Sequence, residues 1–225
     1  MRNLEIKNND SLAPCGRESQ SGRSMIEMLG VLAIIGVLSV GGIAGYSKAM
    51  TKYRINKTIE QITLIAGNVR TFFAPQGNYD GLSSDTTSGK AIIKKAKLVP
   101  DEMWEDGKTL PQNVWGVSVY LYPANKSSNG DKKAFYMQYN MPKEYDICIE
   151  IFSYDWTNAG VKLISLTGPG PSDNVKAPFS LEKAIDLCTA WMSKPAKAAL
   201  PSIPSLFFFD VNDNCVSTEG YNRCS

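Results

Sequence analysis

The feature that most constrains this chain is an unbroken apolar segment near its N-terminus. From Met28 to Ser47, 20 consecutive residues carry no charge. In a helix with a rise of about 1.5 Å per residue, this segment is about 30 Å long, which matches the hydrocarbon core of a bilayer. We therefore expect a membrane-spanning helix. A cleaved secretory signal and a buried core helix are the two alternatives.

The flanking residues favour the membrane-spanning helix over a secretory signal. Residues 1–22 form a polar leader in which three basic residues are offset by three acidic ones, so it lacks the net positive charge of a signal. After the span, apolar residues continue at three- to four-residue steps, with one longer step, along one helix face: Tyr46, Met50, Tyr53, Ile59, Ile62, Ile65, Val69 and Phe73. No proline occurs between Arg23 and Ala74, and Pro75 ends the pattern, so one long helix is predicted from Arg23 to Ala74.

Composition argues against several classes of function. The chain has no histidine, which excludes a Ser-His-Asp triad, a Cys-His pair and His-ligated zinc or haem. A net charge of +2 argues against a nucleic-acid binder that acts through overall basicity. The paired carboxylates Asp101/Glu102 and Glu105/Asp106 lie in polar sequence that does not mark them as an acid/base pair. We expect no enzyme, no catalytic residue, no cofactor and no metal site.

Two weaker patterns have simple interpretations. Asp210 to Asn214 begins like a calcium loop, but Cys215 replaces the expected glycine and Tyr221 the expected glutamate, so a plain turn is favoured. A basic cluster near residue 94 is typical of a solvated face, with DNA contact as the alternative; it contains Lys90, Lys94, Lys95 and Lys97.

The remainder of the chain has the pattern of a small folded head. Breaker-rich sequence separates short segments with helix or strand periodicity. We expect helices at 91–99, at 142–152 with Pro142 in the first turn, and from a Ser180 cap to Trp191; strands are expected at 114–122, 134–140, 161–166 and 205–211. The fold class predicted is α+β, a long helix whose residues 50–73 are covered by a small antiparallel sheet.

The start of the long helix also matches a known family signal. Gly22-Arg23-Ser24-Met25-Ile26-Glu27, followed by the apolar segment, resembles the class III signal of type IV prepilins and pseudopilins. Segments of the head, such as LPQNVWGVSVY (110–120) and SLEKAIDLC (180–188), resemble type IVb pilins in particular. The resemblance implies the type IV pilin fold.

This resemblance implies a set of roles for the N-terminal residues. Prepilin peptidase would cut between Gly22 and Arg23 and methylate the new terminus, leaving Glu27 as the fifth residue of the mature chain. Glu27 would then pair with the terminal amine of a neighbouring subunit, whereas without such a partner it would be solvated at the membrane edge. The implied parts are a leader (1–22), a membrane and assembly helix (23–74) and a globular head (75–225).

Two glycines in the span have the spacing of a helix-packing motif. Gly41 and Gly45 form a GxxxG pair, which allows close approach of helices in lipid. Glycine is also common in membrane helices for other reasons, so this assignment has an equally simple alternative.

The five cysteines divide between the leader and the head. Cys15 lies in the leader, and the four that remain are compatible with two disulfides in an oxidising compartment: Cys148, Cys188, Cys215 and Cys224. Three connectivities are possible. Resemblance to type IVb pilins implies Cys148–Cys188, which leaves Cys215–Cys224 to close a C-terminal loop.

These expectations together describe a structural protein. The resemblance implies a precursor in the bacterial inner membrane and a homopolymeric surface pilus, built by prepilin peptidase and the pilus assembly machinery. The fibre would serve adhesion, twitching motility or DNA uptake, with a host surface or DNA as ligand. The alternatives are a pseudopilin of type II secretion and, from another class, a membrane-anchored or secreted enzyme or binding module.

Overall fold

The computed structural model describes residues 24–125, 130–166, 174–176, 180–193, 202–210, 215–218 and 221–224. The chain divides into two compact units, residues 1–46 and residues 47–225. Helix α1 (Met25–Phe73) contributes its first part to one unit and its last part to the other, and it confirms the long helix expected from the sequence. The leader, the junction Gly22–Arg23 and Cys15 lie outside the described residues.

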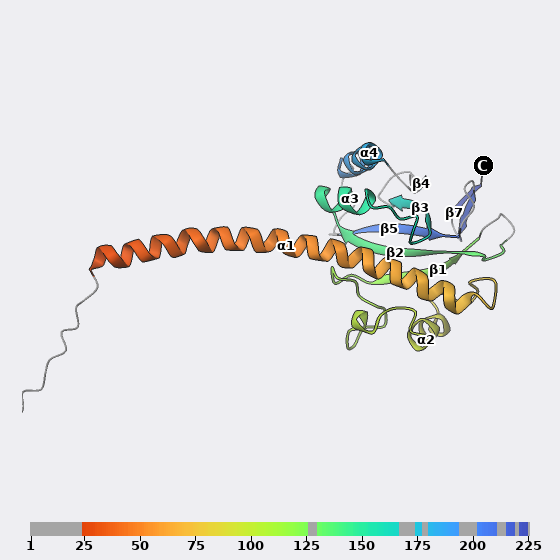
Figure 1. Cartoon of the computed structure of the whole chain (residues 1–225). Helices are drawn as coiled ribbons and strands as arrows, with labels where there is room; N and C mark the ends of the chain where they lie inside the picture. Colours follow the sequence, from red (N-terminus) through yellow and green to blue (C-terminus); the bar gives the residue numbers. More distant parts are fainter. Residues whose placement is uncertain are drawn as a thin grey trace, which may run out of the picture. The chain divides into compact units, whose positions relative to one another are not determined.

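The head unit is built on a five-stranded sheet in which every neighbouring pair is antiparallel (Figure 1). The strand order is β1 (Val119–Ala124), β2 (Ala134–Pro142), β5 (Ser202–Phe209), β3 (Val161–Leu166) and β4 (Asn174–Lys176). The central strand is therefore the last of the five in the sequence. A separate hairpin of β6 (Cys215–Thr218) and β7 (Tyr221–Cys224) follows it. This architecture confirms the predicted α+β class.

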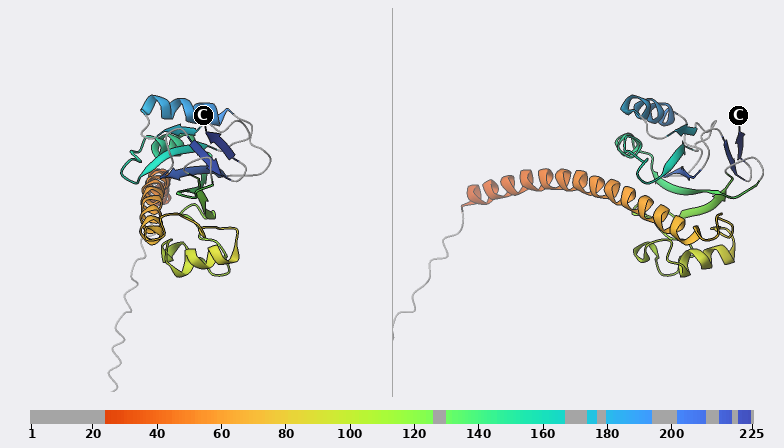
Figure 2. Two further views of the ribbon diagram at one scale, coloured as in Figure 1. Left: turned by 90° about the vertical axis from the view of Figure 1, so that its right-hand side faces the viewer. Right: turned by 45° about the vertical axis from the view of Figure 1, so that its right-hand side comes forward.

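The core lies where the head part of α1 packs on one face of this sheet (Figures 1 and 2). Strand β2 alternates, and its buried side chains include Phe135, Met137, Tyr139 and Met141. Because side chains in a strand alternate between faces, these four point to the same side. They meet the buried face of α1, which consists of Ile55, Thr58, Gln61, Ile62, Ile65, Ala66, Val69 and Phe73.

Three further helices and one short 3₁₀ turn complete the head: α2 (Thr87–Lys95), η1 (Asp101–Met103), α3 (Tyr145–Phe152) and α4 (Leu181–Met192). The predicted N-cap of α4 is confirmed, since the backbone N–H of Lys183 donates to Ser180 Oγ at 3.2 Å. Such a cap satisfies one of the donors that the first helical turn leaves unpaired.

The predicted apolar face of α1 was partly wrong. Within residues 50–73, Ile62, Ile65, Val69 and Phe73 are buried as expected, but Tyr53 is 57% exposed. The polar residues Thr58 and Gln61 occupy the buried face instead, because each has a hydrogen-bond partner in the head.

Two predicted helices were displaced. The helix expected at 91–99 starts earlier, because Thr86 Oγ1 accepts from the backbone N–H of Gly89 and caps it. The helix expected at 142–152 begins only at Tyr145, since Pro142 still pairs with Ser202 of β5 and is therefore a strand residue.

Two predicted strands also had different bounds. In the strand expected at 114–122, the first residues form a loop, because Asn113 Oδ1 accepts from the backbone N–H groups of Trp115 and Val117. The strand expected at 205–211 ends at Phe209, where Asp210 adopts a left-handed φ of 58°. The short elements η1, β4, β6 and β7 were not anticipated.

Candidate assembly site

The first part of α1 presents apolar side chains on all sides. Ile26, Val37 and Val40 are 79%, 76% and 72% exposed, and every residue from Ser24 to Ala49 is exposed. Among the described residues α1 is the one helix long and apolar enough to cross a membrane, and the qualifying window is 0% buried inside the chain. A soluble core helix would be covered by its own protein, so this observation argues against that alternative.

Glu27 lies in the first turn of this helix and forms a capping box with Ser24. The backbone N–H of Ser24 donates to Glu27 Oε2 at 3.2 Å, and the backbone N–H of Ile26 donates to Ser24 Oγ at 3.4 Å. This reciprocal arrangement satisfies donors at the start of a helix. The capping box was not predicted, although the sequence pattern Ser-x-x-Glu before an apolar run is its signal.

The glycine pair of the span has free space beside it. A Cβ atom built on Gly41 or Gly45 meets no other atom within 4 Å. Within the chain, therefore, neither glycine is required by close packing.

In the head, two polar side chains set the register of α1 against the sheet and its loops. Trp115 Nε1 donates to Thr58 Oγ1 at 2.9 Å, and Tyr139 OH donates to Gln61 Oε1. Arg54 lies over the Trp115 ring, 5.6 Å from its centroid. Each buried polar group would lose its partner if α1 slid or rotated, so these contacts favour one placement of the helix.

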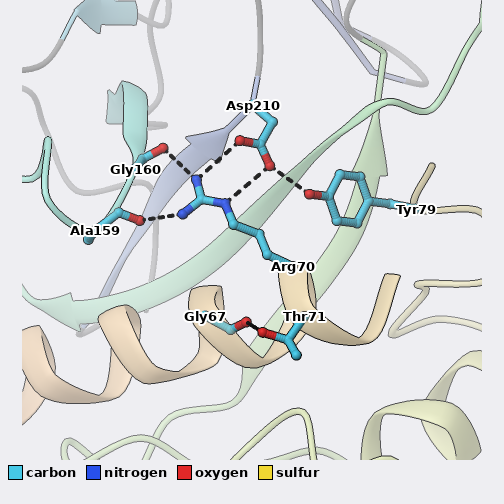
Figure 3. A network of polar contacts seen from close by, with 7 residues as sticks. All are labelled: Gly67, Arg70, Thr71, Tyr79, Ala159, Gly160 and Asp210. Carbon is cyan, nitrogen blue, oxygen red and sulfur yellow. Dashed lines mark hydrogen bonds and ion pairs between the residues drawn. The ribbon is translucent and has the colours of Figure 1, made fainter. Parts of the chain in front are cut away.

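A network around Arg70 joins the end of α1 to the sheet (Figure 3). Arg70 Nε and Nη2 donate to the two carboxylate oxygens of Asp210, at 3.2 and 3.3 Å. Nη1 and Nη2 also donate to the carbonyls of Ala159 and Gly160, at 2.9 and 2.8 Å. A Cβ on Gly160 would lie only 2.2 Å from Arg70 Nη2, so this glycine leaves room for the guanidinium.

The same network explains Asp210, which begins the calcium-like pattern. Its carboxylate accepts from Arg70 and from Tyr79 OH, the latter at 2.6 Å. Burial and the hydrogen bond to Asp210 raise the pKa of the Tyr79 hydroxyl well above its ordinary value. Asp210 is thus a structural ion-pair partner; residues 211–214 lie outside the described part. No sequence pattern linked Arg70 to Asp210, which are 140 residues apart.

The disulfide implied by the resemblance is present. Cys148 of α3 bonds Cys188 of α4, with a Cα–Cα distance of 5.9 Å, and the two residues are 3% and 0% exposed. The other two head cysteines, Cys215 and Cys224, are backbone partners in the β6–β7 ladder.

The basic cluster on and after α2 is partly engaged by neighbouring side chains. Lys94 Nζ lies 5.1 Å from the centroid of the Trp104 ring, and Lys97 Nζ pairs with Asp101 Oδ2 at 3.1 Å. Two of the four lysines thus interact with neighbouring side chains of the head, which explains their positions without a bound ligand.

The chain has a pilin-like fold, in which a long apolar helix with an acidic first turn is joined to a small antiparallel head that carries the Cys148–Cys188 disulfide. The sequence model of the Bundlin family matches residues 47–199. The chain therefore belongs to the Bundlin family, a family of type IVb pilins whose members are structural subunits and not enzymes.

A solved structure, the type IV b pilin from Salmonella typhi, is similar at 16% identity with a TM-score of 0.44. That likeness covers 72% of this chain and 99% of the other. No curated protein matches the chain. The family match lies within the head unit, so the roles of residues before Ser47 rest on their own evidence.

Proposed function

We propose that this chain is the subunit of a surface pilus that assembles by packing of its N-terminal helices. The observation that carries the proposal is the exposed apolar surface of α1 before Ser47, which no part of the described chain covers. Burying such a surface is favourable by about 25 cal/mol per Å², in lipid or against other helices. A precursor held in the inner membrane and a helix bundle in a fibre each provide that burial in turn.

Processing of the precursor follows from the same proposal. Prepilin peptidase removes residues 1–22 by cutting between Gly22 and Arg23, and Arg23 becomes the methylated N-terminus. The membrane and assembly helix then comprises residues 23–74 and the head residues 75–225. The family of the head, together with the start of α1 only a few residues after this junction, supports the cleavage position.

Glu27 sets the register of one subunit against the next. In the subunit described here its carboxylate is held by the Ser24 N–H, so it is partly satisfied before assembly. In the fibre it accepts from the terminal amine of a neighbour, which neutralises both charges away from water. Gly41 and Gly45, which have GxxxG spacing on the exposed part of α1, allow a neighbouring helix to approach closely.

The variant Glu27→Gln tests the role of the charge. Glutamine can still accept the capping-box hydrogen bond, so the helix start is kept while the charge is lost. A neighbour's buried amine would then lack its partner at a cost of about 3–5 kcal/mol, and we expect the yield of sheared surface filaments to fall at least tenfold.

Glu60→Gln, on the exposed side of the same helix, is the matched control. It should leave filament yield unchanged, and both variants should accumulate with an intact Cys148–Cys188 bond. Wild-type yield from Glu27→Gln would contradict the proposed pairing. N-terminal sequencing of exported protein should begin at Arg23, whereas a start near Gly42–Tyr46 would indicate ordinary signal-peptide cleavage.

The pseudopilin of a type II secretion system is the second candidate. Membership in a family of type IVb pilins favours the pilus subunit. Electron microscopy of sheared fibres separates the two, since a pilus subunit is the major protein of long surface filaments. Adhesion, twitching motility and DNA uptake are the uses we propose for such a fibre, with a host surface or DNA as ligand.

A further inference from the structure

The C-terminal hairpin brings two cysteines opposite one another. In the antiparallel β6–β7 ladder, Cys215 is the Cα partner of Cys224, at the opposite end from the pair Thr218 and Tyr221. Directly opposed residues in antiparallel strands have Cα atoms about 4.5–5.5 Å apart. Disulfides span Cα distances of about 4.4–6.8 Å, so the backbone holds this pair within bonding range.

The other head cysteines are not available to either of these two. Cys148 and Cys188 are bonded to each other and lie in the core. We propose that Cys215 and Cys224 form a second disulfide, which closes the hairpin covalently. This inference does not depend on filament assembly.

The bond forms by thiol–disulfide exchange with an external disulfide. One cysteine thiolate attacks a sulfur of that oxidant and releases the first external thiol, giving a mixed disulfide. The second cysteine thiolate then attacks the protein sulfur of the mixed disulfide and releases the second external thiol. Two protein thiols are oxidised to one disulfide, and one external disulfide is reduced to two thiols.

The bridge has a structural task because the hairpin is a two-stranded sheet of its own. An isolated two-stranded hairpin is only marginally stable in water. Strand β6 lies beside β1, which is an edge strand of the five-stranded sheet. The bridge therefore keeps an ordered hairpin next to an edge whose free backbone groups would otherwise be open to pairing with another chain.

The two disulfides should differ in resistance to reductants. Attack on Cys148 or Cys188 requires α3 and α4 to separate, because both residues are buried in the core. The hairpin pairs within a sheet of its own, so we expect it to open while the five-stranded sheet stays intact. We expect graded reduction to open the Cys215–Cys224 bond at a lower reductant concentration than the Cys148–Cys188 bond.

Peptide mapping of the oxidised full-length protein tests the bond. Trypsin cuts after Arg223, so the dipeptide Cys224–Ser225 stays attached to the peptide 198–223 only through a bridge to Cys215. We expect this attached species without reductant and its loss upon reduction. Free thiols at both positions, a bond to Cys148 or Cys188, or a bond between two chains would each overturn the proposal.

Hydrogen exchange of the same protein tests the structural task. The double variant Cys215→Ser/Cys224→Ser should lose amide protection in residues 215–224, while β2 and β5 keep theirs. Ser217→Ala is a control at another position of the same ladder and should retain the hairpin protection. Unchanged protection in the double variant would overturn the role assigned to the bridge.

Discussion

The two parts of α1 use apolar residues in opposite ways. Before Ser47, large apolar side chains such as Ile35 and Val37 are exposed by 52% and 76%, and nothing in the described chain packs on them. After Ser47, the helix buries a single face, and Ile62 and Ile65 are 0% exposed. The part after Ser47 thus buries its apolar face within the subunit, whereas the part before Ser47 needs a membrane or other subunits to cover its apolar side chains.

The same substitution on either side of Ser47 tests the comparison most directly. Ile62→Ala should destabilise the head by about 2–5 kcal/mol, because it opens a cavity in the core. Ile35→Ala should leave head stability within about 0.5 kcal/mol of the wild type. Urea unfolding of the full chain in detergent, followed by tryptophan fluorescence, measures both, and an equal loss for the two variants would contradict the division.

The ion pairs at the two ends of the head part of α1 should contribute unequally. Arg70→Ala removes the donor of two carbonyls and leaves Asp210 with the Tyr79 hydroxyl but without its cation, so it should cost about 1–3 kcal/mol. Lys52→Ala breaks a pair with Glu150 in which the lysine side chain is 61% exposed, and should cost less than about 1 kcal/mol. Thermal unfolding compares the two, and a larger loss for Lys52→Ala would be the contrary result.

Two buried serines allow the value of a satisfied hydroxyl in the head to be measured. Ser205 Oγ is buried and has no hydrogen-bond partner among the described residues, so Ser205→Ala should stabilise the head by about 1 kcal/mol. Ser84 Oγ accepts from the backbone N–H of Leu121 at 2.8 Å, so Ser84→Ala should destabilise it by about 1–3 kcal/mol. Urea midpoints with opposite shifts are expected, and a loss in both variants would show that Ser205 is satisfied in solution.

The smallest effect concerns Lys57, which joins α1 to η1 through Glu102 at 2.9 Å. The hydrogen bond from Lys57 lowers the pKa of Glu102, and hydrogen bonds to Glu102 and Glu60 raise the pKa of Lys57. The contribution of Glu102 to the free energy of unfolding is present above the ordinary pKa of this residue, and it is lost as pH falls through the lowered pKa of the folded state. The contribution of Lys57 to the free energy of unfolding is present below the ordinary pKa of this residue, and it is lost as pH rises through the raised pKa of the folded state.

Glu102→Gln should therefore cost less than about 1 kcal/mol at neutral pH and remove part of the decline in stability at acid pH. Unfolding in urea between about pH 3 and pH 7 measures this, with Glu105→Gln as the control. An acid-side decline identical in the wild type and Glu102→Gln would argue against a contribution from this pair.

Local patterns predicted many elements of the head, and two of their failures have identifiable structural causes. The Ser180 cap was predictable because it depends on residues three apart. Pro142 was assigned to a helix because its residue type suits a first turn, but the pairing with Ser202 makes it a strand residue. The loop at Asn113 similarly displaced the start of β1. At Pro142 a contact between distant residues overrode local preference, whereas at Asn113 a side chain bonded to backbone groups only two and four residues away.

The assembly residues could be recognised from nearby residues in the sequence, whereas the Arg70 network joins residues that are far apart in it. The role of Glu27 was implied by the family resemblance, and Gly41 and Gly45 were identified from their spacing; the capping box with Ser24 was accessible from the local pattern Ser-x-x-Glu. Arg70 and Asp210 could not be connected, since 140 residues separate them and no period relates them.

By itself, the sequence determined that the chain has a long helix with an apolar first part, an α+β head and a cysteine set compatible with two disulfides. These features are read from residues that are close in sequence, through helix and strand periodicity and through prolines and glycines that end an element, or from the residue counts. They can therefore be recognised without the fold. Only the tertiary structure decided that β5 occupies the centre of the sheet, that Thr58 and Gln61 are buried with partners, and that Arg70 joins α1 to Asp210. These features depend on which distant segments pack together. That packing is determined by burial of the whole core, which no short stretch of sequence reveals.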